Sequence, residues 1–437
     1  MQEQTLNSRG EAHLEYFQDL AEKVGGHFFV DGKRLTAEAK RLDSEQTRQK
    51  IKRELLASGI DLGQLAQEAI KLFDSLKSKE VSGHEKSHVV DNLLSAYRIF
   101  QEYEVSGKKL EDFEKLEILM AILGHDLGRG NSDILGKAVV KGGNEKKLDE
   151  KQIEFLAPAI LGKSLIRKLP KELQERILLS IATGFVANTG IRTSDAVHQA
   201  DREQLVGSAT IPRGLAFDVG IGPVHRDLAM SENEEFKTKL PLPGSGKDTN
   251  LLVQYEFYMR NLFSPSSPNG QQVYNEIKKQ NAVVLMLALD GEDPELYDQV
   301  FGLEEREYES AHWSKKPMDP GVYEDAKKGK DDFLSKKADI ASYNPGSEAD
   351  LAIKIMKAEG IVMPQTMRDV LQKKLADLTE GQKKNFWTIL RYTVEKRKEK
   401  IAADLEMIKN SKTGVEHIMA QYCESDLKER QNKYHSL

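Results

Sequence analysis

The chain has 437 residues, of which 39% are hydrophobic, 31% are charged and 7% are aromatic, a composition that favours a mostly helical protein. Its formal net charge of -6 gives no overall attraction for a polyanion, so we do not expect a nucleic-acid partner. The single cysteine, Cys423, excludes an internal disulfide and any metal site built from several cysteines.

The N-terminal residues show no basic region followed by an apolar stretch, so no secretory signal is predicted. The longest apolar run, 282–289, is much shorter than the roughly 18 to 20 residues that span a bilayer. We therefore expect no membrane insertion and a cytoplasmic location, and delivery into another cell as an effector stays open.

Hydrophobic periodicity and chain breakers predict an all-α protein. We expect a helical N-terminal extension at 1–81, a helical-bundle core at 82–215, an irregular and partly helical region at 216–346 that completes or caps the core, and a C-terminal helical domain at 347–437. The helices of the last part are a candidate surface for a protein partner.

Individual elements follow from apolar stripes and turn residues. Asp31-Gly32 suits a two-residue turn, which indicates a small hairpin over 27–35. Ser194 can cap a helix that begins there. Residues 128–148 are rich in Gly and Lys and are expected to form a surface loop, and residues 290–346 to form loops with short helices. The predicted helices are 86–104, 112–127, 172–187, 194–208, 250–263, 271–289 and 382–410.

An adjacent imidazole and carboxylate, His125-Asp126, follow the apolar run Leu116–Leu123. That run is apolar almost all round, so its helix is predicted to be buried and to carry the pair into the interior. A bound metal ion is one explanation. The alternative is an ordinary helix terminus, where the imidazole interacts with the helix dipole and Asp126 caps the next turn.

Four other candidate residues are predicted to lie on helices or next to them. His88 opens a predicted helix, and His84 lies four residues earlier, on nearly the same face if the helix extends that far. His198 and Asp201 are one turn apart and therefore share a face. Taken singly, His88 and Asp201 are better explained as solvated surface residues. Together, imidazole and carboxylate donors suit one divalent ion (Mn, Fe, Co, Ni, Zn or Mg), and the candidate ligands are His88, His125, Asp126 and Asp201.

This pattern resembles the HD superfamily of phosphohydrolases, whose signature is a lone His, a His-Asp pair and a later Asp, all on helices. The resemblance covers residues 82–210 and implies an HD-like helical bundle in which these four residues bind the metal. Arg129 stands where many relatives carry a Lys associated with phosphate contact. Because His198 is the one histidine between the pair and the final Asp, a single metal ion is implied.

The activity that the resemblance implies is metal-dependent hydrolysis of a phosphoester or phosphodiester bond in a nucleotide or a nucleotide-derived small molecule. Arg129 and Arg202 would offset the charge on the phosphate oxygens. His84 or His198 would transfer protons, because histidine titrates near neutral pH.

A second resemblance is to bacterial effector phosphodiesterase domains that cleave ADP-ribose attached to ubiquitin, which are also helical and rest on paired histidines. It implies that His84 and His198 are the acid–base or nucleophile pair and that Arg129 and Arg213 bind the diphosphate, without a metal. The substrate would be a protein linked through ADP-ribose or phosphoribose. A third hypothesis is a non-catalytic helical binding module.

Two further patterns are interpreted as ordinary structure. Residues Pro243–Lys247 look like a phosphate-binding loop but lack the first Gly of the Walker pattern and the Ser or Thr after Lys247. The basic stretch Arg391–Lys400 alternates with Glu395 and Glu399 and is expected to be a solvated helix face.

Overall fold

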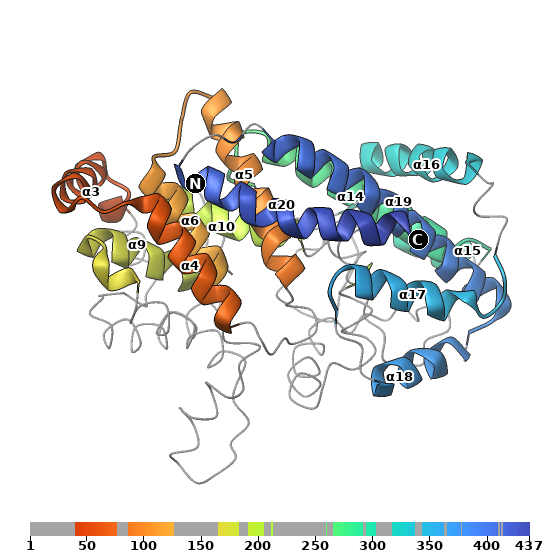
Figure 1. Ribbon diagram of the computed structural model, residues 1–437. Helices are drawn as coiled ribbons and strands as arrows, with labels where there is room; N and C mark the ends of the chain where they lie inside the picture. Colours follow the sequence, from red (N-terminus) through yellow and green to blue (C-terminus); the bar gives the residue numbers. More distant parts are fainter. Residues whose placement is uncertain are drawn as a thin grey trace, which may run out of the picture. The chain divides into compact units, whose positions relative to one another are not determined.

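Every regular element that the computed structural model describes is a helix, so the predicted all-α fold is confirmed (Figure 1). The hairpin expected at 27–35 and the loop expected at 128–148 lie outside the described residues. The structure describes residues 40–76, 86–125, 165–182, 191–204, 211–212, 259, 265–291, 294–302, 317–336, 343–361, 365–376, 378–409, 411 and 414–437.

The chain divides into two compact units. Unit 1 comprises Met1–Arg202, Ser264–Gly270 and Glu406–Asp426, and unit 2 comprises Glu203–Phe263, Gln271–Leu405 and Leu427–Leu437. The domain boundaries expected after residues 81, 215 and 346 stay predictions.

Unit 1 is built around helix α6, which packs against α9, α4 and α5. The run Leu116–Leu123 within α6 is buried as predicted, and each of its apolar side chains is at most 1% exposed. The helices of this unit are α3 (Glu45–Ser58), α4 (Leu62–Leu76), α5 (Lys86–Val105), α6 (Asp112–His125), the short 3-10 helix η2 (Ile166–Lys168), α9 (Lys171–Ala182) and α10 (Arg192–Glu203).

Local sequence explains where α3 begins and ends. The hydroxyl of Ser44 accepts a hydrogen bond from the backbone N–H of Thr47 at 3.2 Å, which caps the N-terminus. At the other end, Gly59 adopts a left-handed conformation with φ of 63°, which glycine reaches without the steric cost of a Cβ.

The predicted start of α10 was wrong by two residues. The helix begins at Arg192, and the backbone N–H of Asp195 already bonds to the carbonyl of Ile191 at 2.9 Å. Ser194 is therefore inside the helix and fully buried, and it does not cap the helix. Helices α5, α6 and α9 begin at or within one residue of their predicted starts, 86, 112 and 172.

Within 290–346, where loops with short helices were expected, unit 2 contains one longer helix, α16 (Pro320–Ser335). Helix α16 has 16 residues, and it starts with Asp319 accepting from the N–H of Gly321 at 2.8 Å and with Pro320 in the first turn. The remaining helices are α14 (Gly270–Ala288), α15 (Pro294–Phe301), α16 (Pro320–Ser335), α17 (Ser347–Ala358), α18 (Gln365–Ala376), α19 (Glu380–Ile408) and α20 (Gly414–His435), with the last residues of α19 and the first half of α20 in unit 1.

Among the described residues, no helix combines the length and the apolar character needed to cross a membrane. The predicted helix at 250–263 lies outside the described residues apart from Met259.

Candidate functional site

The polar face of α5 is buried, although polar helix faces are ordinarily solvated. His88 is 3% exposed and Asn92, one turn later, is fully buried. Asp91 and Ser95 on the same stripe are each 5% exposed. Burying so many polar groups on one helix is costly unless they are satisfied by other groups, so this face is a candidate site.

Helix α10 also buries polar side chains. His198 is 3% exposed, Asp201 is 7% exposed, and the two are one turn apart as predicted. From the sequence alone Asp201 was better explained as a solvated residue, and its burial removes that explanation. Arg202, the next residue, is partly exposed.

The structure brings His88 and Asp201 together. Nε2 of His88 lies 3.4 Å from Oδ1 of Asp201. The side-chain amide of Asn92 donates to Oδ1 of Asp201 at 3.3 Å, and its Nδ2 lies 3.3 Å from Nε2 of His88. Sequence reasoning missed Asn92, whose spacing of four residues from His88 was the available signal.

The separation of these two atoms fits a shared metal ion. Ligands held at about 2.0 to 2.2 Å with angles between octahedral and tetrahedral lie about 2.8 to 3.6 Å apart, and the observed 3.4 Å is inside that range. Nitrogen and carboxylate oxygen are both suitable donors. Among the described residues, no three His, Cys, Asp or Glu side chains form a metal-binding group.

The other predicted site residues are described in part or not at all. Helix α6 is described as far as His125, and the last two residues of the predicted helix 112–127 lie outside the described residues, as does the side chain of His125. The residues outside the described ranges are His84, Asp126, Arg129 and Arg213.

Gln199, beside His198, connects α10 to residues 265–269 of the same unit. Its Oε1 accepts from the backbone N–H groups of Ser266 and Ser267 at 2.8 and 2.9 Å, and its Nε2 donates to the hydroxyl of Ser267 at 2.9 Å. The hydroxyl of Tyr103 on α5 donates to the carbonyl of Ser266 at 3.1 Å. The two helices that carry His88 and Asp201 thus hold the same short segment.

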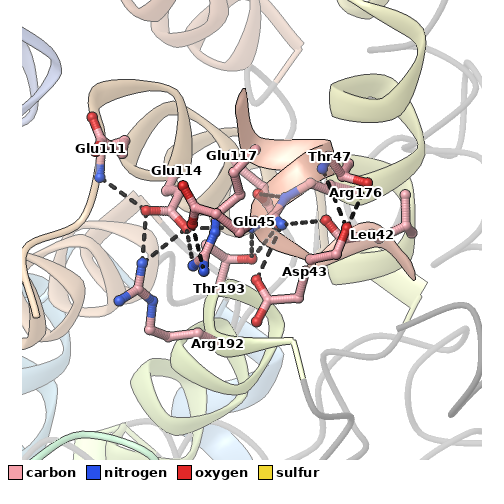
Figure 2. Close-up of polar contacts among 12 residues, drawn as sticks. Leu42, Asp43, Glu45, Thr47, Glu111, Glu114, Glu117, Arg176, Arg192 and Thr193 are labelled. Carbon is pink, nitrogen blue, oxygen red and sulfur yellow. Dashed lines mark hydrogen bonds and ion pairs between the residues drawn. The ribbon is translucent and has the colours of Figure 1, made fainter. Parts of the chain in front are cut away.

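A second buried polar cluster joins α6, α9 and α10, and Figure 2 shows it in close-up. Arg176 and Glu117 are both fully buried, with Nε of Arg176 2.7 Å from Oε2 of Glu117. The hydroxyls of Thr193 and Ser180 donate to Oε1 of the same carboxylate, the latter at 2.9 Å. Nη1 of Arg176 donates to the carbonyl of Leu42 at 2.9 Å.

A neighbouring ion pair extends this cluster. Nη2 of Arg192 contacts both carboxylate oxygens of the buried Glu114, at 2.9 and 2.8 Å (Figure 2). Burial raises the pKa of Glu117, and Arg176 opposes that effect. Burial alone would lower the pKa of Arg176, but its hydrogen bond to Glu117 and the attraction of Glu117, Glu114 and Asp43 together raise the pKa, so this guanidinium stays charged.

Comparison with known proteins finds no matching family model, no matching curated protein and no matching solved structure.

Proposed function

We propose that the chain is a metal-dependent phosphohydrolase or phosphodiesterase acting on a nucleotide or a nucleotide-derived substrate. The observation that supports it most is the 3.4 Å separation of His88 Nε2 and Asp201 Oδ1. Two helices that are remote in sequence present an imidazole and a carboxylate to each other in a buried position, as the HD resemblance requires. His125 and Asp126 are the proposed remaining ligands.

A divalent ion in such a site lowers the pKa of bound water and so supplies a nucleophile at neutral pH. His88 and Asp201 would hold it, and their burial would keep bulk water away from the reacting phosphate. Arg202 follows Asp201 directly, and with Arg129 it would bind the phosphate oxygens. His198, one turn before Asp201, or His84 would transfer the proton to the leaving group.

Elemental analysis of purified protein, combined with an assay on a generic phosphodiester such as bis(4-nitrophenyl) phosphate, tests this function. We expect about one equivalent of transition metal per chain, and activity that a chelator removes and added metal restores. Asp201→Ala should lose both metal and activity, whereas Asp298→Ala, which removes an exposed carboxylate of α15, should keep both. Wild-type protein that binds no metal and stays inactive when metal is added would contradict the proposal.

One observation favours the histidine-based alternative. The amide nitrogen of Asn92 beside Nε2 of His88 is a hydrogen-bond donor, and an imidazole nitrogen that accepts a hydrogen bond is not bound to a metal. With His198 also buried, α5 and α10 carry two buried histidines. If the histidine-based alternative is correct, a protein linked through ADP-ribose would be cleaved even in the presence of chelator. His198→Ala would abolish this cleavage, and Asp298→Ala would not.

A further inference from the structure

We propose that the cluster of Glu117, Arg176 and Thr193 is a positioning device that sets how far α10 lies along α6, and thereby where Asp201 meets the other ligands. This inference rests on the proposed metal site. The three residues belong to three helices, α6, α9 and α10, and none of them touches the His88–Asp201 pair in the contacts described above.

The contacts of Thr193 are directional. Its hydroxyl donates to Oε1 of Glu117 and accepts from Nη2 of Arg176 at 3.2 Å, so both capacities of the oxygen are used. Thr193 and Glu117 are each fully buried. Apolar packing is non-directional and tolerates small sliding of one helix over another, whereas a buried hydrogen bond with fixed partners does not. Thr193 therefore fixes one point of α10 to one point of α6.

Both helices lead from this point toward a predicted ligand. His125 follows Glu117 along α6, and Asp201 follows Thr193 along α10, by eight positions in each case. At a rise of 1.5 Å per residue, each ligand lies about 12 Å along its helix from the hydrogen bond. A rigid helix transmits an axial displacement without loss over that distance, so a shift at Thr193 moves the Asp201 carboxylate by the same amount.

Stability alone is a weak reason for this cluster to be polar. Replacing a buried ion pair with well-packed apolar side chains is often neutral or stabilising. The gain from Glu117 and Arg176 is a defined geometry, and metal sites need one because ligand distances are constrained to within about 0.2 Å.

Thr193→Val and Ser180→Ala form a matched pair for the test. Each removes one buried hydroxyl that donates to Oε1 of Glu117, but Thr193 belongs to α10 and Ser180 to α9, which carries no proposed ligand. The probe is Mn²⁺ alone, titrated calorimetrically into metal-stripped full-length protein, with the melting temperature recorded for each variant. We expect Thr193→Val to weaken Mn²⁺ binding about 10-fold or more and Ser180→Ala to change it by less than about twofold. Thr193→Ser should restore wild-type binding.

Equal effects of Thr193→Val and Ser180→Ala on Mn²⁺ affinity would overturn the positioning role. If the wild type binds no Mn²⁺, the proposed function fails, and hydrogen exchange then decides the positioning role separately. Thr193→Val should speed exchange of the backbone amides from Ala196 to Glu203 relative to those of α9, and Ser180→Ala should not. Unchanged amide exchange in α10 of the Thr193→Val protein would overturn the positioning role.

Discussion

The side-chain amide of Asn92 lies 3.3 Å from Oδ1 of Asp201 at a fully buried position. The same nitrogen lies 3.3 Å from Nε2 of His88, so one amide spans the two atoms proposed to bind the metal. A carboxylate at position 92 would lie beside the Asp201 carboxylate, and two negative charges at this distance repel strongly in a buried site unless a cation lies between them. A substitution at position 92 therefore tests whether a cation binds here.

Asn92→Asp is expected to destabilise the metal-free protein and to be rescued by metal. It places a second buried carboxylate beside Asp201, which costs several kcal/mol without a cation and becomes favourable with one. The measurement is the melting temperature in chelator and in excess Mn²⁺. Asn385→Asp, which changes an amide that donates to the carbonyl of Asp290 at 2.7 Å, should show no such rescue. Equal responses of the two variants to Mn²⁺ would contradict a cation site at Asn92.

Arg176→Met should lower the free energy of unfolding by about 3 to 5 kcal/mol, because it leaves the buried Glu117 carboxylate without its guanidinium. Arg176→Met combined with Glu117→Leu should lose less than Arg176→Met alone, since the uncompensated charge is gone. Urea denaturation at neutral pH measures Arg176→Met, Glu117→Leu and the double variant. A double variant whose loss equals the sum of the single losses would show that the two residues do not act as a pair.

Arg397 and Lys398 are neighbours on α19, but replacing Arg397 is expected to cost far more stability than replacing Lys398. The stretch Arg391–Lys400 was predicted to be a solvated face, and that prediction was wrong for Arg397, which is 1% exposed and makes two hydrogen bonds to Glu359, at 2.6 and 2.8 Å. Arg397→Ala should cost about 3 to 5 kcal/mol, because it removes one partner of a buried ion pair.

Lys398→Ala is the matched control. Lys398 is paired with Glu395 at 3.7 Å on the helix surface, where such pairs contribute about 0 to 1 kcal/mol. Chemical denaturation followed by circular dichroism compares the two variants. Similar losses would mean that Arg397 is not part of a buried cluster.

Gly270→Ala should destabilise the chain, because a Cβ there would lie 2.4 Å from Cβ of Pro265 and 2.8 Å from Nε2 of Gln199. Overpacking of this kind costs about 1 to 3 kcal/mol. Gly329→Ala inside α16 meets only ordinary contacts, the nearest at 3.5 Å, and should leave the melting temperature unchanged or raise it. A Gly270→Ala protein as stable as Gly329→Ala would show that Gln199 does not hold residues 265–269 as described.

Helix positions were largely predictable from the sequence, because they depend on local periodicity and on breakers. The predicted 86–104 and 271–289 agree with α5 and α14 within one residue, and 382–410 agrees with α19 within two. Ser194 was misplaced as a cap because its burial depends on neighbouring helices. The 16 residues of α16 were predicted to lie among loops and short helices, because their many Lys and Asp residues leave only a short apolar stripe. Val322 and Ala326 of this stripe are buried.

The candidate site was predictable where its residue types are distinctive and not where its partners are remote. His88 and Asp201 were found from the pattern of imidazoles and carboxylates, and the structure brings them into contact. Glu117 was passed over inside an apolar run, although a carboxylate there requires a partner. That partner, Arg176, is on another helix, and no local rule connects the two positions.

The most direct test of the metal site is anomalous X-ray scattering from crystals grown with Mn²⁺. The account predicts an anomalous peak about 2.0 to 2.3 Å from both Nε2 of His88 and Oδ1 of Asp201, and no peak there in Asp201→Ala crystals. The contradicting result is a wild-type map without a peak at this position under saturating Mn²⁺, with Asn92 still bonded to both side chains.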